Sequence, residues 1–496
     1  MKTVVSFAFA IAVSVLALIT AYAQLSTLAY IFRTGGDSVP DVPGSNSAKR
    51  PEGYFGSRLQ FKLNCAAVFL LLSGTAGAQV CPQGAGCLDP TFYGGGKYTY
   101  AYGIPPAART VPKAAVMLAD GRYLVLSRSE GGSYSTVLAR FNADGTNDTT
   151  FGPNGDGNIY LEWRVDGSTT GAPGVLALQQ IGADTRIVVA GSQALGSNPT
   201  ALRVERYSFD GVLDPTFGTA GKTLINTSFA NAIAVDAGQR IIVGGSGAMV
   251  VRLQADGIPD GTFGSGGVVK SKSGVNVNGI AVQASGRIVI AGQISPGASK
   301  NQFAVARLNT DGTLDDGTRT DTTRSDSFGS SGKVVPFGNT SSSALRLYID
   351  PSGRIVAGGS LGGFSANDWA VARLMQNGAY DNSFSGDGRL TYDFDGVGDA
   401  IHGIAFQPDG KIIIGGEAFH NGADLDFGIV RFHGDGSVDT SFAQSGRVWT
   451  DFYGGNDDLM GLMLQEDPGC SCTKLLTFGF VETGGVTYGA AARYAL

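Results

Sequence analysis

The residues best suited to chemistry lie between positions 393 and 458. They are acidic side chains together with His402 and His420. Carboxylates gathered in one place can bind a hard cation such as calcium, or they can recognise a polar ligand. The alternative is that these polar loops are simply solvated. The candidate ligand- or metal-binding residues are Asp393, Asp395, Asp399, His402, Glu417, His420, Asp424, Asp426, Asp451, Asp457 and Asp458.

Signals for catalysis are weak in this sequence. The chain holds 3 histidines, and His402 is the best single candidate for acid–base work because an imidazole titrates near neutral pH. No acid or nucleophile stands at a fixed spacing from it. Residues 358–362 match a nucleophile-elbow pattern, but that motif needs a helix after the serine, and here a loop and a strand are expected. We therefore predict no catalytic residue.

A second pattern recurs along the whole chain. An arginine is followed eight residues later by an aspartate, and three residues after that by a phenylalanine. The copy at Arg307 and Asp315 carries an insertion before its Phe328. The arginines are Arg140, Arg206, Arg252, Arg307, Arg373, Arg431 and Arg493, and the regular aspartates are Asp148, Asp214, Asp260, Asp381 and Asp439.

A structural role is the better interpretation of this repeated unit. The aspartate can return through a turn to the arginine and form a bidentate, charge-assisted bond. Another aspartate, in an Asp-Gly pair between them, can bond its own turn. The phenylalanine is expected to be an apolar plug between neighbouring repeats. A calcium loop of the EF-hand type is excluded, because its alternating acidic positions and terminal glutamate are lacking.

The spacing of these arginines averages about 59 residues, which is typical of a propeller or solenoid. Each repeat contains four strand-like stretches; in the clearest copy they are 401–406, 411–416, 427–432 and 447–452. No long segment beyond the N-terminus shows helical spacing of apolar residues. The sequence therefore predicts an all-β, closed seven-bladed β-propeller over residues 79–496, with four antiparallel strands per blade.

Two stretches carry a resemblance to a known family. They are Val212 to Gly218, with the sequence VLDPTFG, and the unit from His402 to Val448 that begins HGIAFQPDGKIIIGG. Both are similar to the bacterial delta-60 repeat and, more distantly, to the NHL repeat. The resemblance covers nearly all of residues 88–496 and implies a β-propeller. It implies no general activity, so no catalytic residues follow from it.

Composition supports strands and tight turns. The chain of 496 residues is 43% apolar and holds 75 glycines, about twice the usual share, while only 16% of its residues are charged. Its net charge of -6 and the lack of a basic run argue against nucleic acid as a partner.

Two segments near the N-terminus resemble export signals. The first has Lys2, an apolar run over 4–19 and a small-residue cleavage pattern at 21–23. The second has an apolar run over 65–72 and the same cleavage pattern at 76–78. We expect residues 1–78 to be absent from the mature protein, which would be secreted, periplasmic or at the cell surface and would have no membrane span. The alternatives are an uncleaved membrane anchor for the first segment and a tethering linker between the two.

The five cysteines suit an exported protein. Cys65 would leave with the second signal, and the remaining disulfide candidates are Cys81, Cys87, Cys470 and Cys472. A zinc site is not favoured, because no histidine lies nearby. We expect a disulfide between the N-terminal and C-terminal pairs. The alternative is local pairing within each of them.

The two ends of the repeat array are incomplete and complement each other. The chain ends just after a third strand, and the segment from Asp89 onward resembles the second half of a repeated turn. We therefore expect 97–102 to pair with 488–494 as the fourth strand of the last blade. Asp89 should then bond Arg493.

Two hypotheses for function follow, and a third interpretation is a purely structural element of a larger adhesin. In the favoured one, the propeller is a binding or scaffold module for an unidentified protein or glycan. Its binding face would be formed by the second-to-third and fourth-to-first strand connections, which vary most between repeats. In the alternative, the chain is a propeller-type hydrolase whose acidic loop residues hold a metal, with calcium as the candidate ion. An enzyme should gather His402 and several carboxylates around one central pocket.

Overall fold

The structure of the chain is a computed structural model. It separates into two units, Met1–Gly74 and Thr75–Leu496, and all described residues belong to the second. The predicted export signals therefore lie outside the described residues. The structure describes residues 85–496 apart from 103–108, 131–135, 162, 164–170, 195–199, 228–229, 298–299, 324–325, 363–367, 395–397, 421–423, 444, 468–469 and 471.

The described residues form 28 β-strands and one short 3-10 turn, η1 (Ser246–Ala248). Twenty of the strands make five separate four-stranded antiparallel sheets. In chain order these are β6 (Gly171–Ile181), β7 (Asp184–Ala194), β8 (Thr200–Tyr207), β9 (Lys222–Ile225); β10 (Ala230–Val235), β11 (Ile241–Gly245), β12 (Met249–Leu253), β13 (Val268–Lys270); β14 (Asn276–Val282), β15 (Ile288–Ile294), β16 (Gln302–Leu308), β17 (Lys333–Val334); β18 (Ser342–Ile349), β19 (Ile355–Leu361), β20 (Asp368–Leu374), β21 (Arg389–Tyr392); and β22 (Ala400–Phe406), β23 (Ile412–His420), β24 (Asp424–Phe432), β25 (Arg447–Thr450).

The other eight strands form one sheet that joins the two ends of the chain. Its order is β26-β27-β28-β2-β3-β4-β5, with β1 also paired to β28. A single parallel pair, Arg109 with Thr487, links β28 to β2, so the sheet consists of two four-stranded groups. The strands are β1 (Lys97–Tyr100), β2 (Arg109–Met117), β3 (Tyr123–Glu130), β4 (Thr136–Phe141), β5 (Asn158–Leu161), β26 (Asp457–Asp467), β27 (Cys472–Thr483) and β28 (Val486–Ala495).

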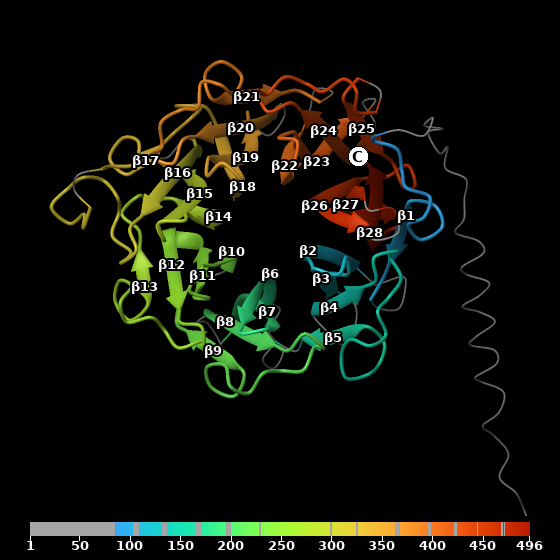
Figure 1. The fold of residues 1–496 in the computed structure, drawn as a ribbon, viewed down its shortest axis with the longest axis horizontal. Helices are drawn as coiled ribbons and strands as arrows, with labels where there is room; N and C mark the ends of the chain where they lie inside the picture. Colours follow the sequence, from blue (N-terminus) through green and yellow to red (C-terminus); the bar gives the residue numbers. More distant parts are fainter. Residues whose placement is uncertain are drawn as a thin grey trace, which may run out of the picture. The chain divides into compact units, whose positions relative to one another are not determined.

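The sheets follow one another in chain order around a common centre, and the last strands lie beside β1 and β2 (Figure 1). The second and third strands of each sheet are almost wholly buried, as in β11 and β12. A strand buried on both faces reads as a continuous apolar run, because neighbouring sheets cover it from both sides. This explains runs such as Ile-Ile-Val-Gly-Gly in the sequence.

Each first strand carries a β-bulge at the same place. A bulge adds one residue to one strand and sharpens its twist. The strands β2, β6, β10, β14, β18, β22 and β26 together line one cavity of about 300 Å³. The bulged residues are Lys113, Gly174, Asn231, Asn278, Leu345, His402 and Met460.

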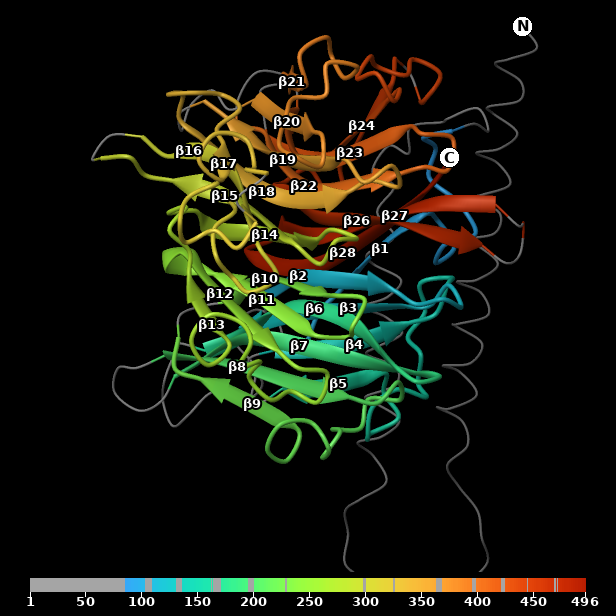
Figure 2. The same cartoon turned by 60° about the vertical axis from the view of Figure 1, so that its left-hand side comes forward.

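The predicted pairing of the chain's two ends is confirmed. Strand β1 runs antiparallel to β28, with Lys97 opposite Ala492 and Tyr100 opposite Gly489. Figure 2 also shows β1 beside β28. The strand is two residues shorter than expected. Leu88 adds an isolated bridge to Tyr494, so the N-terminal turn follows the end of β28 as well.

The repeated arginine and aspartate meet in every repeat, as predicted. In the Arg252 copy, Nε donates to Oδ2 of Asp260 at 2.7 Å, and the guanidinium lies 4.5 Å from the centre of the Phe263 ring. The same Nε–Oδ2 bond occurs at Arg140, Arg206, Arg307, Arg373 and Arg431. In the last repeat Arg493 reaches Asp89 through Nη2 at 2.9 Å.

The expected bidentate geometry is wrong. Oδ1 of Asp260 is taken by the backbone N–H and the hydroxyl of Thr262, two residues later, so only Oδ2 is left for Arg252. Nη2 of Arg252 donates to the same hydroxyl, and Nη1 donates to the carbonyl of Thr310 in the next repeat. The arginine therefore links three partners rather than clamping one.

The phenylalanine packs between consecutive repeats, as predicted. Gly257 of one repeat lies so close to Phe217 of the preceding one that a Cβ on it would be 2.7 Å from the ring. Its backbone is also in the left-handed region, with φ of +87°. Glycine is therefore required at this contact for two separate reasons.

The expected disulfide between the termini is wrong for the C-terminal pair. Cys470 and Cys472 are bonded to each other, with Cα atoms 5.2 Å apart, at the end of the β26–β27 hairpin. A turn can bring residues two apart into the range of Cα distances that a disulfide requires, so no distant partner is needed. Cys87 is half-buried, and Cys81 lies outside the described residues.

Candidate functional site

Three of the predicted acidic residues come together where the last two sheets meet. Asp426 is in β24, Asp451 follows β25, and Asp457 begins β26. One carboxylate oxygen from each lies within 4.8 Å of the other two. Asp426 lies next to a second-to-third connection, and Asp451 and Asp457 lie within and next to a fourth-to-first connection, so these two kinds of connection approach each other here. We call Asp426, Asp451 and Asp457 the aspartate triad.

Burial dominates the electrostatics of the aspartate triad. Asp457 is 0% exposed and Asp426 is 1% exposed, whereas Asp451 is exposed to solvent. Burial, and then the charges of Asp426 and Asp451, raise the pKa of Asp457 to about 8. The Lys97 ammonium partly opposes this rise. At neutral pH, Asp457 thus holds a proton for much of the time.

Lys97 from β1 is a cation whose charge interacts with all three aspartates. Its Nζ donates to the backbone carbonyl of Asp451 at 2.5 Å and lies 4.9 Å from the centre of the Phe452 ring. Burial lowers the pKa of Lys97, while the charges of the aspartate triad oppose that effect. The N-terminal strand therefore supplies part of the site's charge.

A second group forms around His402. Its Nε2 lies 3.0 Å from Oε1 of Glu417, and its Nδ1 is buried without a hydrogen-bond partner. Burial, followed by the charges of Glu417 and Glu482, raises the pKa of Asp458 to about 7. His402 lines the central cavity, as predicted for an inner strand.

The remaining candidates whose side chains the structure describes do not join either group. Asp399 is fully buried, and its two oxygens accept the backbone N–H groups of Phe394 and Phe419, so it caps a loop. Asp393 is exposed after β21, and Asp424 begins β24 half-buried. Asp395 lies outside the described residues, and nothing is described of the His420 side chain.

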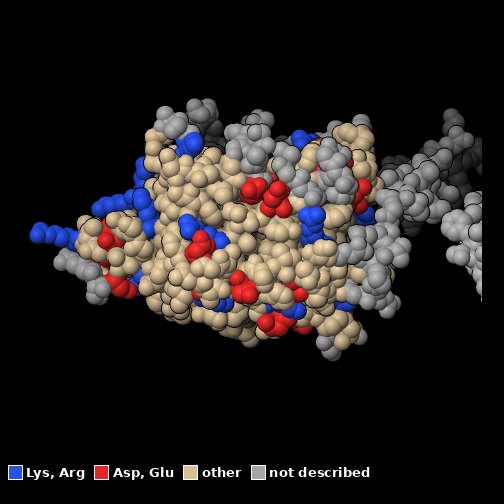
Figure 3. All heavy atoms as spheres, turned by 90° about the horizontal axis from the view of Figure 1, so that it is seen from above, with Lys and Arg blue, Asp and Glu red and all other residues tan. Residues whose placement is uncertain are grey.

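The convergence expected of an enzyme is not seen among the described candidates. Among the predicted residues that the structure describes, only His402 lines the central cavity, whereas the aspartate triad joins β24, the start of β26 and the segment after β25. Figure 3 shows acidic and basic side chains as small separate patches of both signs on one side of the molecule. This agrees with the low charge content of the sequence.

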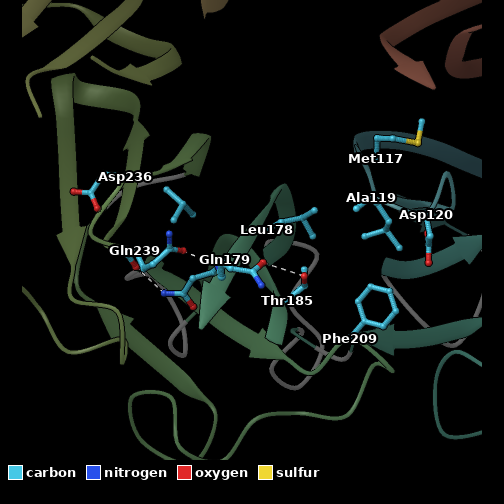
Figure 4. A pocket seen from close by; sticks show the side chains of 12 residues that line it. Met117, Ala119, Asp120, Leu178, Gln179, Thr185, Phe209, Asp236 and Gln239 are labelled. Carbon is cyan, nitrogen blue, oxygen red and sulfur yellow. Dashed lines mark hydrogen bonds between the residues drawn. The ribbon is translucent and has the colours of Figure 1, made fainter. Parts of the chain in front are cut away.

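A larger hollow lies among the turns of the first three repeats. It has a volume of about 720 Å³ and is lined by residues that include Leu178, Gln179, Thr185 and Phe209 (Figure 4). The Gln179 side chain donates hydrogen bonds to two backbone carbonyls and accepts one from Arg206, so its polar atoms already have partners within the chain. No sequence pattern indicated this hollow, because the residues that line it come from three different repeats.

Two further sets of polar residues were missed. The serine or threonine two residues after each repeated aspartate could have been found from the repeat, since only the Arg307 copy, with Gly317, lacks it. Arg346 carried no such signal. Its Nε donates to the carbonyl of His402 at 2.7 Å and its Nη2 to that of Met460 at 3.1 Å, so it joins three inner strands.

Five stretches of the chain match a known family of β-propeller repeats, and these stretches coincide with the repeat described above. The family is described as "Domain of unknown function (DUF5122) beta-propeller", and the matches cover 118–151, 183–217, 283–317, 351–384 and 407–442. Four of them end on the repeated phenylalanine. The match supports the propeller repeat and does not confirm the delta-60 name.

Two solved structures are similar to the chain at 12% sequence identity. One is a crystal structure of an unknown function protein from Dyadobacter fermentans DSM 18053, with a TM-score of 0.43, covering 81% of this chain and 99% of that one. The other is a subtype N11 neuraminidase-like protein of A/flat-faced bat/Peru/033/2010 (H18N11), with a TM-score of 0.34, covering 67% of this chain and 92% of that one. Curated protein sequences give no match. Neither structural likeness bears on activity.

Proposed function

We propose that this chain is an exported β-propeller that binds a protein or a glycan through the face formed by its second-to-third and fourth-to-first connections. The observation that carries the proposal is the aspartate triad, whose carboxylates lie within or next to both kinds of connection and meet in one place. Loops held on a rigid scaffold are where binding residues concentrate. The repeated residues, by contrast, are used within and between repeats.

The proposal includes a ring of seven blades closed by the N-terminal strand. The seven first strands contact one another in a cycle, β2 to β6 and onward to β26, which contacts β2. In each of the first five repeats, Nη1 of the repeated arginine donates to a backbone carbonyl in the next repeat. The acceptor is always the residue three positions after the next repeated arginine. Arg493 makes the same bond at 2.6 Å to Ala143, in the first repeat.

Export is a further part of the proposal. It rests on the two signal-like segments within residues 1–78, on the cysteine pair Cys470–Cys472 and on the low charge content. Among the described residues, no helix has the length and apolar character needed to cross a membrane.

A binding role fits the site better than the hydrolase alternative. An enzyme should aim its acid, its base and any metal at one reacting atom. Here the His402–Glu417 pair belongs to β22 and β23, and His402 lines the central cavity, whereas no residue of the aspartate triad lines that cavity. The two groups do not share a pocket among those described.

The test is a glycan array and a pull-down from extracellular fluid, both with the full chain. Asp451→Asn and Asn456→Ala change the proposed face, and Asp256→Asn changes an exposed turn on the opposite face as the matched control. We expect a captured ligand to be lost with the first two variants and kept with the control. Capture that all three variants retain, or that only Asp256→Asn abolishes, would contradict the proposed face.

A further inference from the structure

The aspartate triad has a counterpart in the preceding sheet that differs in one respect. Asp399 there occupies the position that Asp457 occupies in the last sheet, since each accepts the backbone N–H of a phenylalanine five residues earlier. Asp399 also accepts the N–H of Phe419 with its other oxygen. Both of its oxygens are therefore satisfied by the chain itself.

Asp457 lacks the second of these bonds. Its Oδ2 accepts the N–H of Phe452 at 2.6 Å, but its Oδ1 is buried without a hydrogen-bond partner. The N–H of Glu482 on β27, next to the strand partner of Asp457, donates instead to the carbonyl of Asn456 at 2.9 Å. A buried carboxylate oxygen without a partner is costly, and such atoms in native proteins commonly have a partner from outside the chain.

Where Asp457 has an oxygen to spare, two more carboxylates are at hand. Asp426 and Asp451 each place an oxygen within 4.8 Å of an oxygen of Asp457 and of each other. Asp399 belongs to no such group of three among the described residues. The missing bond and the grouped carboxylates thus occur at the same residue.

We propose that the aspartate triad, formed by Asp426, Asp451 and Asp457, binds a single divalent cation of the calcium class. The cation is bound by this chain alone, so the inference goes beyond the proposed recognition of a partner and does not depend on it.

The carboxylates lie close enough together to share one calcium ion. Their ligand oxygens are all within 4.8 Å of one another, and two oxygens on one calcium ion can be about 4.6 to 5.2 Å apart. Calcium also accepts flexible coordination by carboxylates, whereas magnesium demands near-ideal octahedral geometry and loses its water reluctantly. Because Asp451 is exposed, the ion can enter from solvent and complete its shell with water.

The charges around the aspartate triad also suit a divalent ion. Three ionised aspartates and the Lys97 ammonium leave two negative charges, which one such cation neutralises. The groups that face Asp457 are Asp426 on β24, Asp451 after β25, Lys97 on β1 and Tyr494 on β28.

The test is isothermal titration of the full chain, stripped with a chelator, with calcium chloride and separately with magnesium chloride. We expect one calcium per chain, with a dissociation constant on the order of 10⁻⁴ to 10⁻³ M or lower, and weaker binding of magnesium. Asp451→Asn and Asp457→Asn should each weaken calcium binding about tenfold or more. Asp393→Asn, at the position in the preceding sheet that matches Asp451, should leave it unchanged.

Two results would overturn the inference. No heat of binding and no rise in melting temperature at about 10 mM calcium, above the weakest constants of extracellular modules, would overturn the inference. Equal affinity in wild type and Asp451→Asn would overturn it too. Since Asp451 is exposed, that variant decides the matter even if Asp457→Asn fails to fold. Failure of the proposed partner binding, measured by capture, would leave the calcium titration unaffected.

Discussion

At the scale of single residues, the seven repeated arginines show how a charged side chain is kept inside a β-sheet protein. Arg252 is 2% exposed, and Asp260, Thr262 and the carbonyl of Thr310 accept its bonds while the Phe263 ring covers one face. Burying an ion is unfavourable unless its charge and its donors are matched. The same arrangement recurs in the other repeats, although Nη2 of Arg307 and Nε of Arg493 are buried without a hydrogen-bond partner.

Removing one partner of this buried pair should therefore be severe. Asp260→Ala leaves the Arg252 guanidinium without its charge partner, and we expect a loss of about 3 to 5 kcal/mol in the free energy of unfolding. Asp256→Ala, four residues earlier in the same turn, removes an exposed side chain and should cost less than about 1 kcal/mol. Chemical denaturation of both variants measures the difference. Equal losses would show that the buried pair has no special role.

Buried carboxylates should also make the chain less stable at high pH. Burial raises the pKa of Asp399 to about 6, of Asp458 to about 7 and of Asp457 to about 8. A carboxyl with a higher pKa in the folded state binds its proton more tightly there, so its contribution is complete below pH 4 and is lost as the pH rises through the folded pKa. Without calcium, the free energy of unfolding should thus fall between pH 5 and 8.5.

The Asp458→Asn variant isolates one part of this dependence. Asn cannot ionise, so the fall in stability around pH 7 should be smaller in the variant than in the wild type. Denaturation at pH 5.5, 7 and 8.5 with a chelator present measures it. A steeper fall in Asp458→Asn, or stability that rises with pH in the wild type over this window, would show that the sign of these shifts is wrong.

At the scale of elements, neighbouring sheets are held by contacts that recur with each repeat. A phenylalanine of one repeat packs on the Asp-Gly glycine of the next, as Phe217 does on Gly257 and Phe151 on Gly211. The backbone adds a bond beside each contact, such as the N–H of Gly218 to the carbonyl of Asp256. A phenylalanine–glycine contact therefore joins one repeat to the next in these pairs.

This packing predicts a contrast between two glycines of one turn. Gly257→Ala places a Cβ 2.7 Å from the Phe217 ring at a positive φ, and we expect a loss of about 2 to 4 kcal/mol. A Cβ on Gly261 would meet nothing within 4 Å, so Gly261→Ala should be nearly neutral. Thermal or chemical unfolding of the two variants checks the contrast. Similar losses in both would mean that close packing between sheets does not limit stability.

The sequence predicted the strands and the Arg–Asp pairs because both repeat and depend on local spacing. It could not predict that the oxygens of Asp260 are shared between Arg252 and Thr262, since that depends on turn geometry. The bulges at positions such as His402 leave no mark in composition. Eleven candidate residues were named, but only the three-dimensional arrangement of two sheets selects Asp426, Asp451 and Asp457 from them. The prediction of a disulfide between the two termini was wrong for Cys470, because Cys472 lies near it in the same hairpin.

At the scale of the whole molecule, the account depends on how the chain's two ends meet. Strand β1 adds the fourth strand to the last sheet, Asp89 bonds Arg493, and Lys97 reaches the carbonyl of Asp451. The same N-terminal segment thus completes the sheet, the last Arg–Asp pair and the charge around the aspartate triad. The proposed ring closure and the charge around the proposed cation site both depend on this strand.

A disulfide engineered across β1 and β28 tests this central claim most directly. Thr99 lies opposite Ala490, and cross-strand Cα atoms at either kind of antiparallel pair fall within the range that a disulfide needs. In the Thr99→Cys, Ala490→Cys variant of the full chain, a non-reducing digest should yield one peptide pair joined at these two positions. The control pairs Thr99→Cys with Tyr160→Cys on β5, the outer strand of the first group, and should yield none. Joining only in the control would show that the N-terminal strand belongs to the first sheet and that the ring is not closed as proposed.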